Sequence, residues 1–319
     1  MLDSWKDRRA IRRLLGPTVQ IEERVQLRRT AEARTTVLSL AGHRSRYVLK
    51  TYRRATNAHR EAETLGAVRG LTGVSAPRCY GAAGGWVVRQ FIEGKTLAAL
   101  QQEMGFTHCL GHYASAVEGL AAIHAAREAV AARTALHDPF RRPILISRLR
   151  RAFRRIERVG FARYAARAGE LPESWSTLPW VALMERLTED LHTDPKLVVL
   201  GHGDYCAANL IVATPGHVVA IDWDQLSLAT PWRDLGRLLR FAPEAHWLDL
   251  IRRYFTARGE SERLPNLSES RSLELLESGI LYDCLLVARI AAKSMRYVSI
   301  PGATDDFREA LDTLVERST

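Results

Sequence analysis

The strongest constraint on the fold of this chain comes from two short apolar segments, each followed at once by polar residues. The first segment reads LVVLGHGD and leads into Asp204, and Asn209 follows five residues later. The second reads HVVAIDWD and leads into Asp222, thirteen residues after Asn209. Apolar runs of this length are typical of short strands, and loops at strand ends often carry functional side chains. We therefore expect Asp204, Asn209 and Asp222 to face one cleft.

Two carboxylates and an amide in this order suit phosphoryl transfer from ATP. That reaction needs a carboxylate to orient the attacking hydroxyl, hard oxygen ligands for Mg²⁺, and a cation that holds the α- and β-phosphates. The predicted base is Asp204, and the predicted magnesium ligands are Asn209 and Asp222. The predicted cation is Lys50, one of only five lysines in the chain. Taken singly, each Asp or Asn is more simply a turn residue, but the ordered set favours the catalytic interpretation.

The rest of the chain separates into a strand-rich part and a helical part. Residues 24–53 read as three short strands, with a hairpin turn at 42–45 between the second and the third. A helix is predicted over 58–68, a turn over 75–81 and a further strand over 86–92. From Leu97 the pattern is helical for about a hundred residues. We therefore expect an α+β protein of two lobes: a small antiparallel-sheet lobe over 1–92, a linker at 92–96, and a larger, mainly helical lobe over 97–319.

The motifs HGD-x4-N, IDWD and RDLG together resemble those of the aminoglycoside phosphotransferase and choline kinase family, relatives of the protein kinases. The resemblance extends from about Ile21 to the C-terminal helices. It implies a bilobal protein-kinase-like fold, with ATP and Mg²⁺ as cofactors. It also implies a catalytic loop at 202–209, in which Asp204 is the catalytic residue, and magnesium ligation by Asn209 and Asp222.

The same resemblance implies which residues hold the nucleotide. The family's phosphate-binding lysine lies on the third strand and pairs with a helix glutamate. In this chain these residues are Lys50 and Glu61, with Glu63 as the less favoured glutamate. The family's linker strand binds the adenine edge through its backbone, which here implies Gln90 and Ile92.

Three further residues are expected near the site. Asp234, in RDLG, resembles the family's buried structural aspartate close to the catalytic loop. We interpret His202 as support for that loop rather than as a base. The loop at 30–36 has no glycine, so it is not a glycine-rich phosphate cradle. Candidate substitutes for such a cradle are the backbone N–H groups and hydroxyls of Thr30, Thr35 and Thr36, or the guanidinium of Arg34.

The spacing after Asp222 bears on the kind of acceptor. Protein kinases place an activation segment of roughly 20–30 residues after the metal-binding aspartate. Here only twelve positions lead from Asp222 to Asp234, so there is no room for a peptide-docking segment. We therefore expect a small-molecule acceptor or a glycolipid headgroup. Tyr282 and Asp283, on a predicted C-terminal helix, are candidates to line the acceptor pocket.

A second feature that bears on the acceptor is an arginine-rich stretch between Pro139 and Gly160. Its apolar residues recur at helical spacing, and six arginines surround them: Arg148, Arg150, Arg151, Arg154, Arg155 and Arg158. One interpretation is a core-packed helix with a solvated basic face. The other is a surface for anionic lipid or an acidic substrate. Because polycationic drugs would favour acidic residues, the cluster counts against an aminoglycoside acceptor.

Composition narrows the possible partners and the location of the protein. The net charge is +10, and residues 1–60 carry all of it, with 15 basic and 5 acidic residues. No apolar run is long enough for a membrane span or a secretory signal. The four cysteines lie far apart, which favours reduced thiols and a cytoplasmic protein. We expect no nucleic-acid partner and no obligate protein partner, but leave open peripheral contact with the inner face of an anionic membrane.

Three hypotheses therefore remain. The first is a kinase for a small molecule such as an amino alcohol, a sugar or an antibiotic. The second is a kinase for a lipid-linked or acidic glycan at a membrane surface, which would use the helix around Arg148–Arg158. The third is a catalytically inactive nucleotide-binding module or a nucleic-acid binder, for which replacement of Asp204 would change nothing.

Overall fold

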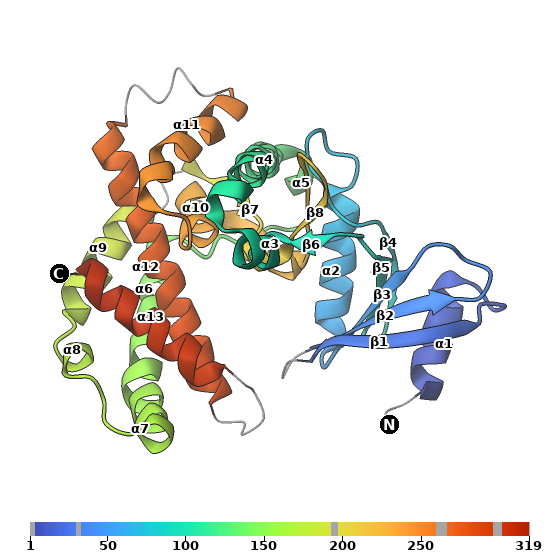
Figure 1. Ribbon diagram of the computed structural model, residues 1–319, viewed down its shortest axis with the longest axis horizontal. Coiled ribbons are helices and arrows are strands. Elements are labelled where there is room, and N and C mark those ends of the chain that lie inside the picture. Colours follow the sequence, from blue (N-terminus) through green and yellow to red (C-terminus); the bar gives the residue numbers. More distant parts are fainter. Residues whose placement is uncertain (1–3, 30–32, 193–196, 260–266, 296–301, 319) are drawn as a thin grey trace. The chain divides into compact units, whose positions relative to one another are not determined.

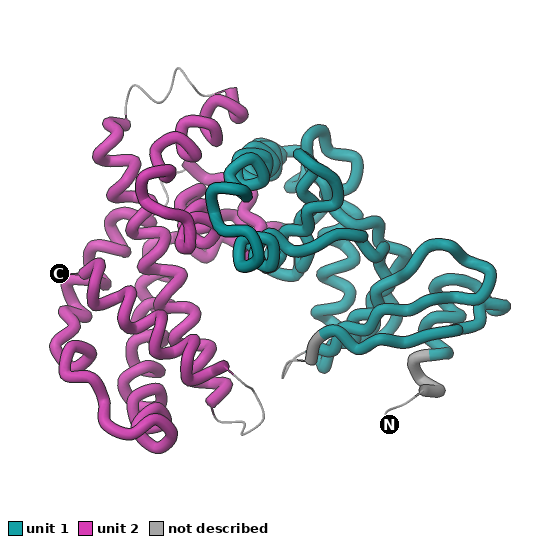
Figure 2. Tube along the Cα trace, viewed as in Figure 1, with its two compact units in different colours: residues 1–135, 207–226 teal, residues 136–206, 227–319 magenta. Residues whose placement is uncertain are grey.

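The computed structural model describes residues 4–29, 33–192, 197–259, 267–295 and 302–318 (Figure 1). The chain divides into two compact units, of which the first comprises residues 1–135 and 207–226 and the second residues 136–206 and 227–319 (Figure 2). Among the described residues, no helix combines the length and the apolar character that crossing a bilayer requires. The predicted lobe boundary at 92–96 stays a prediction.

The first unit is built on a five-stranded antiparallel sheet with the order β1-β2-β3-β5-β4. Its strands are β1 (Ile21–Arg29), β2 (Ala33–Leu40), β3 (Tyr47–Tyr52), β4 (Cys79–Ala83) and β5 (Trp86–Gln90). The predicted antiparallel sheet is therefore present, but the predicted turn at 75–81 is wrong from Cys79 onwards. Gly81 adopts a φ of +134° and allows an irregular pairing with β5, so a segment that reads as a turn forms an edge strand.

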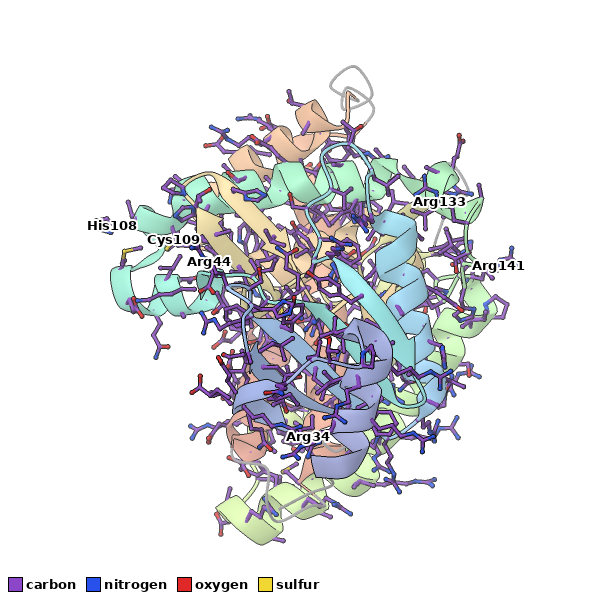
Figure 3. The ribbon with its side chains drawn as sticks, turned by 90° about the vertical axis from the view of Figure 1, so that its right-hand side faces the viewer. Arg34, Arg44, His108, Cys109, Arg133 and Arg141 are labelled. Carbon is purple, nitrogen blue, oxygen red and sulfur yellow. The ribbon has the colours of Figure 1, made fainter. Side chains whose placement is uncertain are left out.

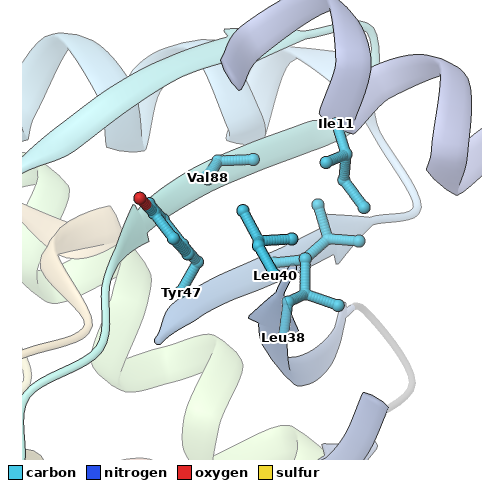
Figure 4. Packing of buried hydrophobic residues seen from close by; sticks show 6 residues of the cluster. Ile11, Leu38, Leu40, Tyr47 and Val88 are labelled. Carbon is cyan, nitrogen blue, oxygen red and sulfur yellow. The ribbon is translucent and has the colours of Figure 1, made fainter. Parts of the chain in front are cut away.

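Strand alternation gives the two faces of this sheet different roles. One face is covered by α1 (Ser4–Leu15), a helix that the sequence analysis did not predict (Figure 4). It packs Ile11 into a fully apolar cluster: Leu38, Leu40, Tyr47, Leu49 and Val88. The other face lies under α2 (Ala55–Val68), where Tyr52, Ala58 and Val87 are buried. Because side chains alternate along β3, Lys50 points to the same face as Tyr52, under α2.

The remainder of the first unit is a set of helices and a small three-stranded sheet. The helices are α3 (Leu97–Met104), α4 (Phe106–Ala125) and α5 (Arg127–Ala131). The sheet has the order β6-β8-β9 and consists of β6 (Lys95–Thr96), β8 (Leu210–Thr214) and β9 (His217–Ala220). Gly94, at the start of β6, has a φ of +134°, and a Cβ there would lie 2.2 Å from the Val212 carbonyl oxygen. Only glycine lets the linker approach β8 so closely.

The second unit is mainly helical. Its helices comprise α6 (Arg142–Arg155), the π-helical η1 (Ile156–Phe161), α7 (Ala162–Ala168), α8 (Glu173–Ser176), α9 (Trp180–Leu191), α10 (Pro231–Leu239), η5 (Glu244–His246), α11 (Trp247–Ala257), α12 (Glu269–Ser294) and α13 (Ala303–Ser318). A two-stranded antiparallel sheet joins β7 (Val199–Gly201) to β10 (Ser227–Ala229). The long helix α12 is central, since it contacts α6, α9, α10, α11 and α13.

Candidate active site

The candidate site of the first unit centres on the buried ammonium of Lys50, whose side chain is only 6% exposed. It forms ion pairs with Asp222, with Asp224 at 3.5 Å and with Glu61 at 3.7 Å. Burial by itself would lower the pKa of Lys50, but attraction from these three carboxylates outweighs it and raises the pKa. Lys50 is therefore a permanent positive charge in a largely dry position.

Local structure explains why Glu61, and not Glu63, meets Lys50. Glu61 lies on the face of α2 that packs against the sheet and is fully buried, whereas Glu63 is exposed. Glu61 is held by the Tyr52 hydroxyl, which donates to it at 2.6 Å, and by Arg89 at 3.5 Å. A buried carboxylate with two polar neighbours on strands of the same sheet is fixed before any ligand arrives.

Asp222 reaches Lys50 through a strained turn. It lies two residues after the end of β9 and has a φ of +69°, the only positive φ of a non-glycine residue in the described part of the chain. Such a conformation costs about 1–2 kcal/mol for an L-residue. The neighbouring Trp223, fully buried in η4 (Trp223–Gln225), anchors the turn by donating from Nε1 to the Ala220 carbonyl at 2.8 Å. Strained backbone of this kind is common at functional sites.

Asn209 lies at the same end of the β8–β9 hairpin as Asp222. It ends the short helix η3 (Ala207–Asn209) and is 6% exposed. Its carbonyl accepts from the Ile221 N–H at 2.9 Å, next to the first paired positions, Leu210 and Ala220. One end of the hairpin thus carries both an amide, before β8, and a carboxylate, after β9.

The donor set of this hairpin fits magnesium. Mg²⁺ prefers hard oxygen atoms, usually takes one or two carboxylates from a protein, and completes its shell with water and phosphate. Asp222 and the side-chain oxygen of Asn209 are such donors. In the described ranges there is no larger cluster of His, Cys, Asp and Glu arranged to hold a metal. A metal that binds together with a nucleotide does not require such a cluster, because the phosphates supply further oxygen ligands.

The sequence analysis missed Asp224 and Tyr52. Asp224 forms an ion pair with Lys50, and the Tyr52 hydroxyl donates to it at 3.1 Å. Burial raises the pKa of Asp224 to about 6, opposed by Lys50 and reinforced by repulsion from Asp222 and Glu61. The signal was present in IDWD, where two aspartates flank a tryptophan. The motif alone could not assign Asp224 to the site, because only the structure shows that both carboxylates turn towards Lys50.

The second unit contains a separate charge centre around Arg237. Its guanidinium, 18% exposed, forms ion pairs with Asp204 and with Asp283. Burial would lower the pKa of Arg237, but attraction from Asp283 and Asp204 outweighs it and raises the pKa. Arg240 adds a contact to Asp283 at 3.5 Å. The predicted base is therefore clamped by an arginine that the sequence analysis did not single out, although it stands directly after RDLG.

The turn before Asp204 is held by the RDLG segment. Gly203 has a φ of +87°, and its N–H donates to the fully buried Asp234 carboxylate at 3.0 Å. Its carbonyl accepts from the Arg233 guanidinium at 2.7 Å. His202 is also fully buried, and its Nδ1 accepts from the Asp204 N–H at 3.3 Å. His202 and Asp234 are therefore both buried beside this turn, and their supporting roles stay predictions.

Facing glycines bring the two ends of the Arg237 centre together. A Cβ at Gly236 of α10 would lie 2.4 Å from the Gly279 backbone, and one at Gly279 of α12 would lie 2.0 Å from the Trp232 carbonyl oxygen. The two helices therefore touch backbone to backbone at this point. Arg237 and Asp283 follow these glycines along their helices and meet as a result.

The structure places the residues predicted to bind the adenine and the phosphates as follows. Gln90 ends β5, where its N–H donates to the Arg78 carbonyl at 2.8 Å. Ile92 follows in the linker and is half-buried. Arg34 lies near the start of β2, in register with Thr51 (Figure 3). The preceding residues 30–32 of that loop lie outside the described residues. The nucleotide-binding roles of Gln90, Ile92 and Arg34 stay predictions.

The predicted acceptor residues occupy different environments. Tyr282 is 1% exposed, and its ring packs against Phe140 with centroids 5.3 Å apart. Asp283 is engaged with Arg237 and Arg240, which suits a structural role as well as a substrate-binding one. Asn209 and Asp222 belong to the first unit and Asp204 to the second, so the expectation that all three face one cleft stays a prediction.

The sheet, the helical remainder and the polar residues at strand ends define a protein-kinase-like phosphotransferase. The model of the phosphotransferase enzyme family matches residues 24–271, and this chain belongs to that family. A comparison with curated protein sequences found no match.

Solved structures similar to the chain have the same fold. An aminoglycoside 2'-phosphotransferase-IIIa mutant in complex with GDP has a TM-score of 0.66 and 15% identity, covering 99% of this chain and 97% of that one. A choline kinase from Cryptosporidium parvum has a TM-score of 0.66 and 12% identity, covering 94% and 89%. A spectinomycin phosphotransferase in complex with ADP and spectinomycin has a TM-score of 0.60 and 16% identity, covering 93% and 94%.

Proposed function

We propose that this protein transfers the γ-phosphoryl group of ATP, with Mg²⁺, to a hydroxyl group of a small-molecule acceptor such as an amino alcohol, a sugar or an antibiotic. The observation that carries the proposal is the Lys50 centre. It holds a buried cation against Glu61 and Asp222, with Asn209 at the same hairpin end as Asp222. Family membership supports phosphoryl transfer as the reaction class.

The Lys50 centre supplies the residues that would hold the nucleotide. Lys50 binds the α- and β-phosphates, and Glu61 keeps the ammonium in place when Asp222 turns from it towards the metal. Asn209 and Asp222 would hold Mg²⁺, which neutralises charge on the phosphate oxygens when bound. Asp224, hydrogen-bonded to Tyr52, remains close to Lys50 as a second carboxylate.

Asp204 acts as the base on the acceptor. Its carboxylate accepts the proton of the attacking hydroxyl and aims that oxygen at the phosphorus atom. Arg237 contacts Oδ1 of Asp204 and restricts the orientation of the carboxylate. The proposal requires Asp204 and the Lys50 centre to serve one nucleotide, and only four residues separate Asp204 from Asn209 in the chain.

The test is a screen for ADP release across amino alcohols, sugars, antibiotics and glycolipid headgroups, with ATP and Mg²⁺. Once an acceptor is found, Asp204→Asn should lower kcat by about 10²–10⁴-fold, the usual contribution of a general base. Asp249→Asn, which removes a carboxylate from an exposed ion pair with Arg252, is the matched control and should leave kcat unchanged. Wild-type turnover by Asp204→Asn would refute the assignment of the base.

A second candidate is favoured by the arginine-rich helix α6: a kinase for a lipid-linked or acidic glycan, with α6 in peripheral contact with an anionic membrane. A cytoplasmic location belongs to both candidates and is part of the proposal. The absence of nucleic-acid and obligate protein partners also stays a prediction.

A further inference from the structure

The two edges of α6 carry the same kind of charge in different surroundings. Arg148, Arg151 and Arg155 are spaced i, i+3 and i+7, so they form one stripe along the helix. We call these three residues together with Arg289 of α12 the arginine cluster. Arg148 and Arg155 are half-buried, Arg151 and Arg289 are exposed, and α6 contacts α12. Two members of the cluster therefore lie partly against the protein, and the other two face solvent.

Within the described residues, the arginine cluster has no acidic partner. In the part of the chain that the structure describes, none of its four members forms a salt bridge with an acidic side chain. Burial lowers the pKa of Arg289, and repulsion from Arg151, Arg148 and Arg155 lowers it further. Four guanidinium groups this close destabilise one another unless an anion lies among them.

The opposite edge of α6 lies beside two acidic side chains. Arg142 and Arg150 line a cavity of about 500 Å³ together with Glu185 and Glu189 of α9. Two acidic side chains therefore lie on the same cavity wall as these two arginines. The same helix thus presents arginines near acidic side chains on one edge and, within the described residues, arginines without an acidic partner on the other, which favours binding of an external anion at the second edge.

The arginine cluster is connected to the predicted base through α12. Asp283 of α12 pairs with Arg237, which in turn contacts Asp204. Arg289 follows Asp283 by six residues, about 9 Å along the helix axis.

Tyr282 lies on α12 between the Arg237 centre and Arg289 of the arginine cluster. It stands seven residues before Arg289, close to two full turns, so both residues lie on one face of α12. Its hydroxyl is buried and has no hydrogen-bond partner in the described part of the chain. Tyr282 is close enough to Arg289 to act on the pKa of that guanidinium. A buried donor without a partner at the edge of an arginine cluster is suited to a ligand oxygen.

We propose that the arginine cluster binds a phosphate or carboxylate group of the acceptor, so that this enzyme acts on an anionic substrate. This inference rests on the proposed function. Guanidinium groups pair with phosphate and carboxylate through two parallel hydrogen bonds, which gives both affinity and orientation. The anionic group would sit on the arginine cluster while the hydroxyl to be phosphorylated points towards Asp204.

The test measures binding and not turnover, so it remains informative if phosphoryl transfer is never found. The full chain is saturated with ADP and Mg²⁺ to occupy any nucleotide site and is then titrated calorimetrically with glucose 6-phosphate, citrate and the neutral control glucose. In a second arm it is mixed with phosphatidylglycerol vesicles or phosphatidylcholine vesicles. The first arm reports a soluble anion and the second a lipid headgroup.

Two double variants of the same helix region separate the cluster from charge in general. Arg148→Gln/Arg289→Gln removes half of the cluster, and Arg142→Gln/Arg150→Gln removes the same charge from the opposite edge. We expect the first variant to bind the anionic probe at least about tenfold more weakly than the wild type, and the second to bind it within about twofold. Thermal unfolding of both variants checks that each is folded.

Each outcome decides the proposal. Binding of glucose 6-phosphate or citrate that is lost only in the cluster variant supports it with a soluble acceptor. Vesicle binding alone, lost in the same variant, supports it with a lipid headgroup as the source of the anion. The proposal is overturned if no anionic probe binds better than its neutral control, or if both double variants lose binding equally.

Discussion

Lys50 in the first unit and Arg289 in the second are cations in opposite electrostatic surroundings. Lys50 is surrounded by Glu61, Asp222 and Asp224, and its pKa is raised. Arg289 is surrounded by other arginines, and its pKa is lowered. The first charge is neutralised inside the protein, so its position is fixed in advance. The second awaits a counter-charge from outside, so its site is complete only with a ligand.

The largest expected change in stability comes from removing Lys50, the cation that is paired with acids inside the protein. Lys50→Ala leaves three carboxylates without their buried counter-charge, which should lower the free energy of unfolding by about 3–5 kcal/mol. Urea unfolding measures the change. Lys95→Ala is the control, because Lys95 is 58% exposed and pairs with Glu103 at the surface. It should cost less than about 1 kcal/mol, and equal losses would show that Lys50 is not held as described.

The glutamate that orients Lys50 provides a sharper functional test. Glu61→Gln keeps an acceptor for the Tyr52 hydroxyl but removes the charge beside Lys50. We expect the KM for ATP to rise about tenfold in the ADP-release assay, because Lys50 loses the buried carboxylate that orients its ammonium. Glu63→Gln, two residues further along α2 and exposed, should leave KM within about twofold. Similar effects from both substitutions would contradict the pairing of Glu61 with Lys50.

The crowding of acids around Lys50 predicts a pH dependence in the metal-free protein. The folded-state pKa of Asp224, about 6, lies above its ordinary value of 3.8, so the folded protein binds the proton more tightly than the unfolded one. Stability should therefore fall as the pH rises from about 4 to about 6. Urea titrations in EDTA measure this slope, and Asp224→Asn should reduce it. A slope of the opposite sign in this contribution would contradict the assigned pKa.

The smallest expected effect is on the uncompensated side. Arg289→Gln relieves repulsion from the other members of the arginine cluster and should raise the free energy of unfolding by about 0.2–0.5 kcal/mol. The gain should shrink in about 1 M salt, where the Debye length falls to about 3 Å. Arg252→Gln, which removes an exposed arginine paired with Asp249 and Glu269, should give no such gain. A loss of stability in Arg289→Gln would mean that its charge is compensated after all.

Sequence reasoning predicted the fold class, which the structural neighbours confirm, and a set of reacting groups that stays a prediction, because both rest on local signals. The apolar segments before Asp204 and Asp222 contain strands β7 and β9, and the family resemblance favoured Glu61, which is buried, over Glu63, which is exposed. The resemblance to the phosphotransferase family supplied the bilobal fold, and the structural neighbours confirm that fold class. Helix α1 and edge strand β4 were missed because each takes its stability from packing on the sheet and not from a strong pattern of its own.

The order and types of the polar residues are properties of the sequence alone, and they suffice to predict a phosphotransferase with a lysine, two aspartates and an asparagine in defined roles. Only the tertiary structure decided which charges compensate one another. Lys50 meets Asp222 across 172 positions of chain, and Arg237 meets Asp283 across 46. No local pattern encodes such pairs, because they arise where helices and strands pack, as at the glycine contact between α10 and α12. Among the described residues, the same packing leaves the arginine cluster without a salt bridge to an acidic side chain.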